Sequence, residues 1–380
     1  MSSLQEVVAS AVTEGDVPFA VGMLADSGGV LETAAAGEAR PGHAADENTV
    51  FRIFSMTKAV GSVAAMILID RGKLTMETEV AEILPDWSAL KVLDGWDGDT
   101  PRLREPARAA TVRHLATHTS GLEYEFWNAD VAKYLEVTGH PSILAGTRQS
   151  LNYPLTKDPG TGWGYGIGID WLGLVIEAVD GRKVDAFCRE EIFEPLKMTS
   201  TAFEPDGMTD RLCDVVMRGE DGGFGPFDLA PPPKPEVYGM GHALYSTPAD
   251  YMRFLRVVLN RGALDGARIL SEGAVDRMLA DQMQGQTVQP MQTVAPPVSA
   301  DVDPFPGTRL THSFAFMRNE EDIEDRRRAG SQSWAGVCNT HYWIDPASDR
   351  AGVIMTQSLP FVEPRFMKTY EAFERAVYAS

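Results

Sequence analysis

Hydrophobic positions divide the chain into two β-rich ends and a mostly helical middle. Near the N-terminus, apolar residues at helical spacing over residues 4–13 predict a helix, and two short apolar runs around Asp26-Ser27-Gly28-Gly29 predict a β-hairpin. Near the C-terminus, residues 365–378 have the pattern of a closing helix. Before that helix, four apolar runs predict strands at residues 311–317, 328–333, 338–344 and 352–357.

The middle of the chain carries helical patterns and one long irregular stretch. The glycine- and proline-rich residues 219–236 predict a loop or a boundary, because this composition disfavours regular structure. Capping residues and apolar spacing predict helices at residues 111–115, 170–181, 184–193 and 247–262.

The simplest assembly of these elements is an α+β fold. The two chain ends share one antiparallel sheet flanked by the terminal helices, and the middle is inserted as a helical domain. We therefore expect residues 1–75 and 237–380 to form an α/β sheet domain and residues 76–236 a mostly helical inserted domain. A cleft between the two is the expected place for an active site.

The composition excludes some classes of partner. A formal net charge of −20 and a pI near 4.8 argue against binding to nucleic acid and to anionic membrane surfaces. The basic run Arg326-Arg327-Arg328 lies among acidic residues, so we expect a solvated, self-paired loop there. A small molecule is the expected partner, and a homo-oligomer stays open.

The sequence also carries an expectation about location. Its N-terminal residues lack the pattern of a secretory signal peptide, and no stretch has the 18 or more apolar residues typical of a membrane span. The three cysteines are odd in number and widely spaced, which favours reduced thiols over a disulfide framework. We expect a soluble cytoplasmic protein.

The segment Ser55-Met56-Thr57-Lys58 carries the strongest chemical signal. It opens a helical pattern over residues 59–68, and a helix places positions i and i+3 on one face, so the Lys58 amine can take the proton of the Ser55 hydroxyl. Unpaired N–H groups at a helix start also favour negative charge beside the serine. The alternative is a simple N-cap with a solvated lysine. A second Ser-x-x-Lys, Ser88 to Lys91, precedes a polar loop and is expected to be structural.

Two further segments are candidate parts of the same site. Tyr165 lies in a glycine-dense turn and could act as a proton shuttle if Lys58 lowers its pKa. The segment 333–337, between two predicted strands, is rich in small residues, so a backbone N–H there could complete an oxyanion hole with that of Ser55. Each segment also has a purely structural interpretation. Tyr165 could be an aromatic side chain that only fills space, and residues 333–337 could be a β-turn with an exposed tryptophan.

Together, in this order and spacing, these segments resemble the serine β-lactamase and penicillin-binding-protein superfamily, and more narrowly the family VIII carboxylesterases, which are similar to class C β-lactamases. The resemblance covers nearly the whole chain and implies a β-lactamase-like fold. It implies Ser55 as nucleophile, Lys58 as base, Tyr165 as the family's tyrosine, and the N–H groups of Ser55 and Val337 as oxyanion hole. It places Trp334-Ala335-Gly336 where lactamases have Lys-Thr-Gly.

Two departures from the lactamase pattern concern the substrate. Trp334 stands in place of a lysine that helps to hold the substrate carboxylate, and Ile167 in place of an asparagine that holds its amide. Losing both contacts should cost on the order of 2–5 kcal/mol of binding to a β-lactam. An apolar wall of Ile167, Trp334, Ala335 and Gly336 suits a neutral acyl ester, and Tyr124 and Trp127 are candidates to line the cleft.

Metal chemistry is not expected. His114 and His118 have the i, i+4 spacing of a metal pair on a helix, but no third ligand is apparent. We expect no metal and no cofactor.

The sequence thus predicts a serine esterase that hydrolyses short-chain carboxylic esters through an acyl-enzyme on Ser55. The alternatives are a β-lactamase or DD-peptidase, an acyltransferase that uses the same acyl-enzyme, and a silent binding scaffold that retains the fold.

Overall fold

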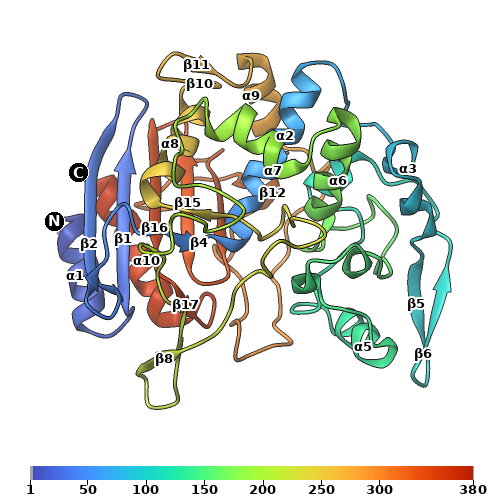
Figure 1. The fold of residues 1–380 in the computed structure, drawn as a ribbon, viewed down its shortest axis with the longest axis horizontal. Helices are drawn as coiled ribbons and strands as arrows, with labels where there is room; N and C mark the ends of the chain where they lie inside the picture. Colours follow the sequence, from blue (N-terminus) through green and yellow to red (C-terminus); the bar gives the residue numbers. More distant parts are fainter. Residues whose placement is uncertain (1–2, 380) are drawn as a thin grey trace.

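An eight-stranded antiparallel sheet joins the two ends of the chain (Figure 1). The computed structural model describes residues 3–379. The strand order is β12-β13-β14-β15-β16-β1-β2-β3, and β1 pairs with β16 so that Val21 lies opposite Met355. The prediction of an antiparallel sheet shared by both chain ends is confirmed. The strands are β1 (Phe19–Ala25), β2 (Val30–Arg40), β3 (His43–Ala44), β12 (Leu310–His312), β13 (Met317–Asn319), β14 (Gln332–Gly336), β15 (Thr340–Asp345) and β16 (Arg350–Met355).

Helices cover both faces of this sheet. The terminal helices α1 (Leu4–Thr13) and α10 (Pro364–Ala379) pack on one face, where Trp343, Ile354 and Phe373 share a core. On the other face, α8 (Pro248–Leu259) packs on β1, β15 and β16, and Val21, Val353 and Met355 share a core with apolar residues of α2 (Thr57–Asp70). Because successive strand side chains point to opposite faces, a strand covered on both sides is apolar throughout. All of β1 is accordingly buried.

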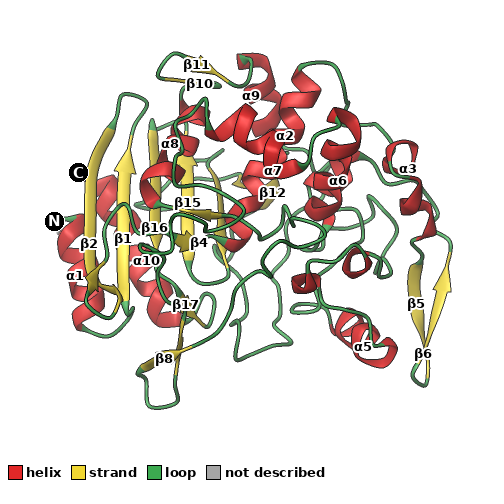
Figure 2. Ribbon diagram, in the orientation of Figure 1, coloured by secondary structure: helices red, strands yellow, loops and turns green. Residues whose placement is uncertain are grey.

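The rest of the chain consists of short helices joined by long loops, with short hairpins at its edges (Figure 2). Helix α6 packs along α2, which brings the start of α6 close to the start of α2. The domain limits 75/76 and 236/237 stay a prediction. The helices are α3 (Val80–Ile83), α4 (Val112–Ala116), α5 (Ala129–Thr138), α6 (Gly168–Asp180), α7 (Val184–Cys188) and α9 (Glu272–Leu279). The small strands are β4 (Phe51–Arg52), β5 (Val92–Asp97), β6 (Thr100–Arg104), β7 (Val216–Arg218), β8 (Phe224–Pro226), β9 (Tyr245–Ser246), β10 (Ala263–Leu264), β11 (Ala267–Arg268) and β17 (Ser358–Leu359).

Three local expectations need correction. The predicted strand at 311–317 is two strands, because a turn closed by the Ser313 N–H donating to the Phe316 carbonyl separates β12 from β13. The strand expected at 328–333 begins at Gln332 and runs to Gly336, so the Trp334 segment lies within a strand. The loop predicted at 219–236 contains β8, which pairs with β7.

The arginine run is also not a wholly solvated loop. Arg327 is fully buried, and its Nε lies 2.7 Å from the Glu374 carboxylate on α10. Only Arg328 behaves as expected, since it is exposed and pairs with Asp322. The sequence pattern could not reveal this because Glu374 lies far away in the chain.

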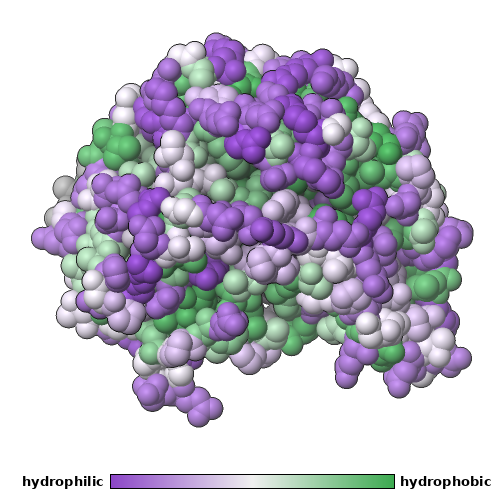
Figure 3. All heavy atoms as spheres, viewed as in Figure 1, coloured by the Kyte–Doolittle hydropathy of each residue, from purple (hydrophilic) through white to green (hydrophobic). Residues whose placement is uncertain are grey.

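The three cysteines, Cys188, Cys213 and Cys338, are buried free thiols. Among residues 3–379, no helix combines the length and the apolar character needed to cross a membrane. The surface in Figure 3 is largely hydrophilic, and one group of its apolar residues lies along the lower edge of this view, between β8 and α5. An apolar cavity beside Ser55 opens in the same part of the molecule.

Candidate active site

Ser55 lies on a sharp turn between β4 and α2. A 3-10 turn, Phe54–Met56, connects the two elements, and Phe54 has a φ of +40°. A bulky residue in the left-handed region costs roughly 1–2 kcal/mol, so the surrounding packing must hold it there. Phe54 is buried in a cluster with Val215, Cys338 and Leu359. This cluster fixes the turn that presents the Ser55 hydroxyl.

Two side chains donate hydrogen bonds to the Ser55 hydroxyl oxygen. Lys58 Nζ lies 3.1 Å from Ser55 Oγ, and Tyr165 Oη lies 2.8 Å from it. The Trp334 indole N–H donates in turn to Tyr165 Oη over 3.1 Å. The structure therefore brings together four residues that the sequence singled out, from the Ser55 turn, α2, the loop before α6, and β14.

Lys58 is held as a base near neutral pH. Burial disfavours the ammonium and lowers the pKa of Lys58 from 10.5 to about 7, although the charge of Asp170 acts in the opposite direction. The amine also donates to Tyr124 Oη at 2.9 Å and to the Gly241 carbonyl at 2.8 Å. A neutral amine has two hydrogens, so when these serve Tyr124 and Gly241 its lone pair faces the Ser55 hydroxyl.

The pKa of Tyr165 is shifted in the direction opposite to the expectation. Burial raises its pKa, and the hydrogen bonds with Ser55 and Trp334 only partly oppose this shift. Lys58 Nζ lies over the ring, 4.8 Å from its centroid, and donates to Tyr124 instead. The idea that Lys58 lowers the pKa of Tyr165 is therefore wrong. Tyr165 is a neutral phenol that can relay a proton.

Two residues of the site had no role in the sequence interpretation. Asp170, in the first turn of α6, is fully buried, and its Oδ1 accepts the Gly241 N–H at 2.9 Å. A Cβ on Gly241 would lie 2.6 Å from Asp170 Oδ2 and 2.8 Å from Tyr124 Oη, so only glycine fits. Asp170 thus fixes the backbone whose carbonyl orients Lys58. A glycine-dense segment around Gly241 was the only sequence signal.

Replacing Asp170 by asparagine should test this arrangement. Asparagine keeps an oxygen for the Gly241 N–H but removes the charge that favours the Lys58 ammonium. We expect the acid limb of the kcat/KM profile to shift to lower pH by roughly one unit, the lower end of what a neighbouring opposite charge contributes.

The other titratable groups facing Lys58 do not mask this effect. Burial raises the pKa of Tyr124 and Tyr165 and lowers the pKa of His118 and His242, so these groups remain neutral near pH 7. If the acid limb of the Asp170→Asn profile stays in place or shifts to higher pH, Asp170 does not have the proposed effect on the pKa of Lys58. Asp170→Ala, which also removes the acceptor of the Gly241 N–H, should lose more activity than Asp170→Asn.

A narrow apolar cavity begins at Ser55, and we call it the Ser55 pocket. Its volume is about 130 Å³, and Tyr124, Trp127 and Val337 lie in its wall. The Val337 N–H donates to no acceptor among residues 3–379. The remaining lining residues are Phe54, Phe126, Ile143, Leu144, Phe227, Leu229, His242, Val298 and Ser299.

Strand β14 approaches the Ser55 turn closely. A Cβ on Gly336 would lie 2.3 Å from the Ile53 carbonyl oxygen, so a larger residue would push the strand away. Trp334 is half-buried, and both it and Ala335 line a second cavity described below. Ile167 is different, because it is fully buried. The expectation that Ile167 contacts substrate is therefore corrected.

The two histidines with the spacing of a metal pair, and the second Ser-x-x-Lys, make other contacts. His114 Nδ1 accepts the Thr111 N–H at 3.1 Å, and the His118 ring packs 4.9 Å from that of Tyr165. Among residues 3–379, no group of three or more His, Cys, Asp or Glu side chains could hold a metal ion. In the second Ser-x-x-Lys, Lys91 pairs with Glu105.

Known proteins that resemble this chain include acyltransferases and an esterase. A monacolin J acid methylbutanoyltransferase from Aspergillus terreus is 31% identical over 349 residues, covering 87% of this chain and 82% of that protein. A lovastatin esterase from Penicillium rubens is 28% identical over 363 residues, covering 91% and 88%. The unliganded structure of simvastatin synthase (LovD) from Aspergillus terreus superposes with a TM-score of 0.85 at 28% identity, covering 99% of this chain and 97% of that one.

The resemblance noted in the sequence is thus confirmed at the level of the family and the fold. The relatives combine acyl transfer and ester hydrolysis in their names, and the Ser55, Lys58 and Tyr165 geometry suits either reaction. The family model described as Beta-lactamase matches residues 4–376. The chain therefore belongs to the β-lactamase family.

Proposed function

We propose that this protein is a serine esterase of the family VIII type, which hydrolyses short-chain carboxylic esters through an acyl-enzyme on Ser55. The observation that carries the proposal is the position of the Ser55 hydroxyl. The hydroxyl contacts both Lys58 and Tyr165, and Ser55 lines an apolar cavity of about 130 Å³. A short acyl chain matches the size and apolar lining of this pocket.

Acylation begins with proton transfer from Ser55 to the neutral Lys58 amine. Ser55 Oγ attacks the ester carbonyl carbon, and the resulting oxyanion accepts hydrogen bonds from the N–H groups of Ser55 and Val337. As the carbon–oxygen bond to the alcohol breaks, Tyr165 donates its proton to the leaving oxygen. The proton that Lys58 took from Ser55 then passes to the Tyr165 phenolate, which restores the neutral amine and the neutral phenol. Water then repeats the attack on the acyl-enzyme and releases the acid.

The residues beside Ser55 favour an ester as substrate over a β-lactam. Trp334 presents an indole where a lactamase lysine would hold a carboxylate, and its N–H is already used by Tyr165. The substrate carboxylate would lose a charge-assisted partner, a loss of about 1.5–3 kcal/mol of binding free energy.

A second candidate is acyl transfer to an alcohol or amine in place of water. Its support is the methylbutanoyltransferase among the relatives. The chemistry up to the acyl-enzyme is the same in both reactions, and only the second nucleophile differs.

The test compares p-nitrophenyl butyrate with a chromogenic cephalosporin, using wild-type protein and Ser55→Ala. We expect ester turnover, little cephalosporin cleavage, and loss of the ester activity in Ser55→Ala by about 10³-fold or more. Mass spectrometry of quenched wild-type protein should find one butyryl group on the peptide that contains Ser55. Ser88→Ala, in the second Ser-x-x-Lys, is the matched control and should keep full activity.

The outcomes separate the alternatives. A cephalosporin that reacts faster than the ester would favour a lactamase. Butyrate transferred to an added alcohol faster than to water would favour an acyltransferase. If neither substrate reacts and no butyryl group is found on Ser55, the esterase proposal is wrong and a binding scaffold takes its place.

A further inference from the structure

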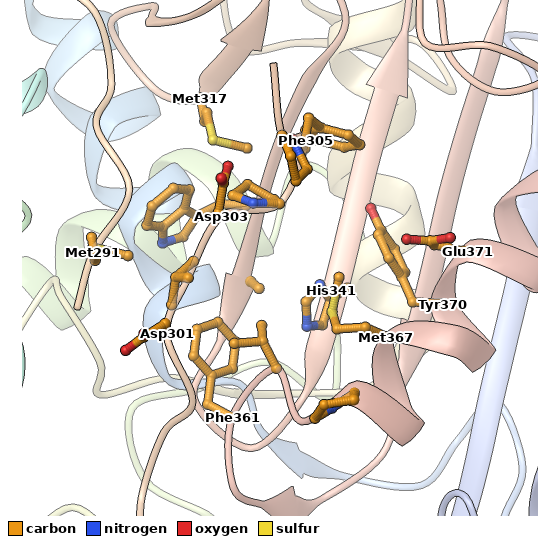
Figure 4. A pocket seen from close by; sticks show the side chains of 18 residues that line it. Met291, Asp301, Asp303, Phe305, Met317, His341, Phe361, Met367, Tyr370 and Glu371 are labelled. Carbon is orange, nitrogen blue, oxygen red and sulfur yellow. The ribbon is translucent and has the colours of Figure 1, made fainter. Parts of the chain in front are cut away.

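A second and larger cavity lies on the other side of Trp334, and we call it the Trp334 pocket. Its volume is about 290 Å³, roughly twice that of the Ser55 pocket. Strand β14, α10 and the loop 291–306 enclose it, and Phe361 and His341 lie between them (Figure 4). Among the described residues, its apolar lining includes Met291, Phe305, Met317, Trp334, Phe361 and Met367.

Trp334 connects this cavity to the catalytic group. Its ring centroid is 4.8 Å from that of Tyr165, and its indole N–H donates to Tyr165 Oη. The phenol that would protonate a departing alcohol is therefore one side chain away from the cavity. An alcohol oxygen at Tyr165 Oη would have its carbon skeleton beside the indole.

The loop 291–306 contributes to the lining of both cavities. Val298 and Ser299 line the Ser55 pocket, whereas Val302 and its neighbours line the Trp334 pocket. This segment is held to the core because the Phe361 N–H donates to the Val298 carbonyl and the Ala300 N–H donates to the Phe361 carbonyl. The two cavities thus adjoin along this loop, and each has its own set of lining residues.

The charged residues that line the Trp334 pocket are all acidic. Asp301 and Asp303 are exposed on the loop, and Glu371 lies opposite on α10 (Figure 4). The lining contains no lysine or arginine, and burial lowers the pKa of His341 to about 3, so its imidazole is neutral. Arg326 and Arg327 lie beneath Phe305, but both contact the buried Glu374 carboxylate.

We propose that the Trp334 pocket binds the alcohol half of the ester, and that it selects bulky neutral or cationic alcohols against those that carry a carboxylate. This inference rests on the proposed acyl transfer through Ser55. The apolar lining favours a bulky skeleton, and the three rim carboxylates repel an anion. In acyl transfer to an alcohol, the same pocket would hold the acceptor.

The test uses three esters with the same acyl group: ethyl butyrate, cyclohexylmethyl butyrate, and the cyclohexylmethyl ester with a carboxylate on the ring. We expect kcat/KM for the cyclohexylmethyl ester to exceed that for ethyl butyrate by about tenfold because of the added apolar contact. The ring carboxylate should reduce kcat/KM about tenfold or more at low salt, and less at high salt.

Variants identify the cavity responsible. Asp301→Asn combined with Asp303→Asn should bring the ratio of neutral to anionic ester to within about threefold. The matched control is Asp97→Asn combined with Asp206→Asn, which removes two exposed carboxylates that line neither cavity. Met367→Trp should fill the pocket and lower the ratio of cyclohexylmethyl to ethyl ester about tenfold, whereas the volume-conserving Met367→Leu should not.

Three results would overturn the inference. The first is equal kcat/KM for the neutral and anionic esters in wild-type protein, and the second is an equal response of both double variants, which would assign the effect to net charge. The third is a size preference that Met367→Trp leaves unchanged. In each case Ser55-dependent hydrolysis of ethyl butyrate would still stand. Failure of the proposed function would instead abolish turnover of all three esters.

Discussion

Replacing Lys58 by methionine is expected to lower kcat/KM for p-nitrophenyl butyrate by about 10³-fold or more, within the range that a lost general base produces. Methionine preserves most of the buried volume but has no lone pair to accept the Ser55 proton. It also leaves Tyr124 Oη and the Gly241 carbonyl without their donor, so a thermal melt should accompany the kinetics. A folded variant that keeps more than a tenth of the activity would contradict the role of Lys58.

The same assignment fixes the pH dependence of the wild-type enzyme. Only the neutral amine can accept the serine proton, so activity should be lost as the pH falls through the pKa of Lys58, which is about 7. The acid limb of kcat/KM should therefore have its midpoint near pH 7. A rate that is flat from pH 5 to pH 9, with an unchanged rate-limiting step, would exclude Lys58 as the base.

The chain provides a matched control in its second Ser-x-x-Lys. Lys91 is partly exposed, pairs with Glu105 and lines neither cavity. Lys91→Met should leave both the rate and the pH profile unchanged. An equal effect of the two substitutions would point to the general loss of a positive charge.

The sequence predicts the parts of the site that local geometry controls. Ser55 and Lys58 are one helical turn apart, so their contact at 3.1 Å follows from spacing alone. The antiparallel sheet follows from apolar runs at both chain ends. Even so, the limits of β14 differ from the pattern, because pairing with β15 extends the strand through Trp334 to Gly336.

Long-range packing decides what the sequence does not reveal. Asp170 reaches Gly241 because the neighbouring Met240 packs closely on Gly173 of α6, and nothing near either residue in the chain indicates that pair. Ile167 turns inward because Gly166 packs directly on the Leu122 backbone, where a Cβ would lie 2.2 Å from the carbonyl oxygen. Tyr124 looks like a cleft residue in the sequence, yet it also accepts a hydrogen bond from Lys58.

The two tyrosines of the site should respond differently to the same substitution. Tyr165 donates to Ser55 Oγ and receives the Trp334 N–H, whereas Tyr124 contacts the Lys58 amine. Tyr165→Phe should lower kcat/KM for ethyl butyrate by about 10²- to 10³-fold, because a poor leaving group needs a proton as it departs. Tyr124→Phe should cost about tenfold, since it removes one orienting contact of the base.

The leaving group separates these roles further. p-Nitrophenolate departs without a proton, so acylation by p-nitrophenyl butyrate should suffer less from Tyr165→Phe than acylation by ethyl butyrate, by about tenfold or more. Tyr124→Phe acts through the base, so acylation by the two esters should be impaired equally. Single-turnover acylation rates would measure this difference. Equal losses for both esters in Tyr165→Phe would mean that the phenol only positions Ser55, and the proton for the alcohol would then have to come from Lys58.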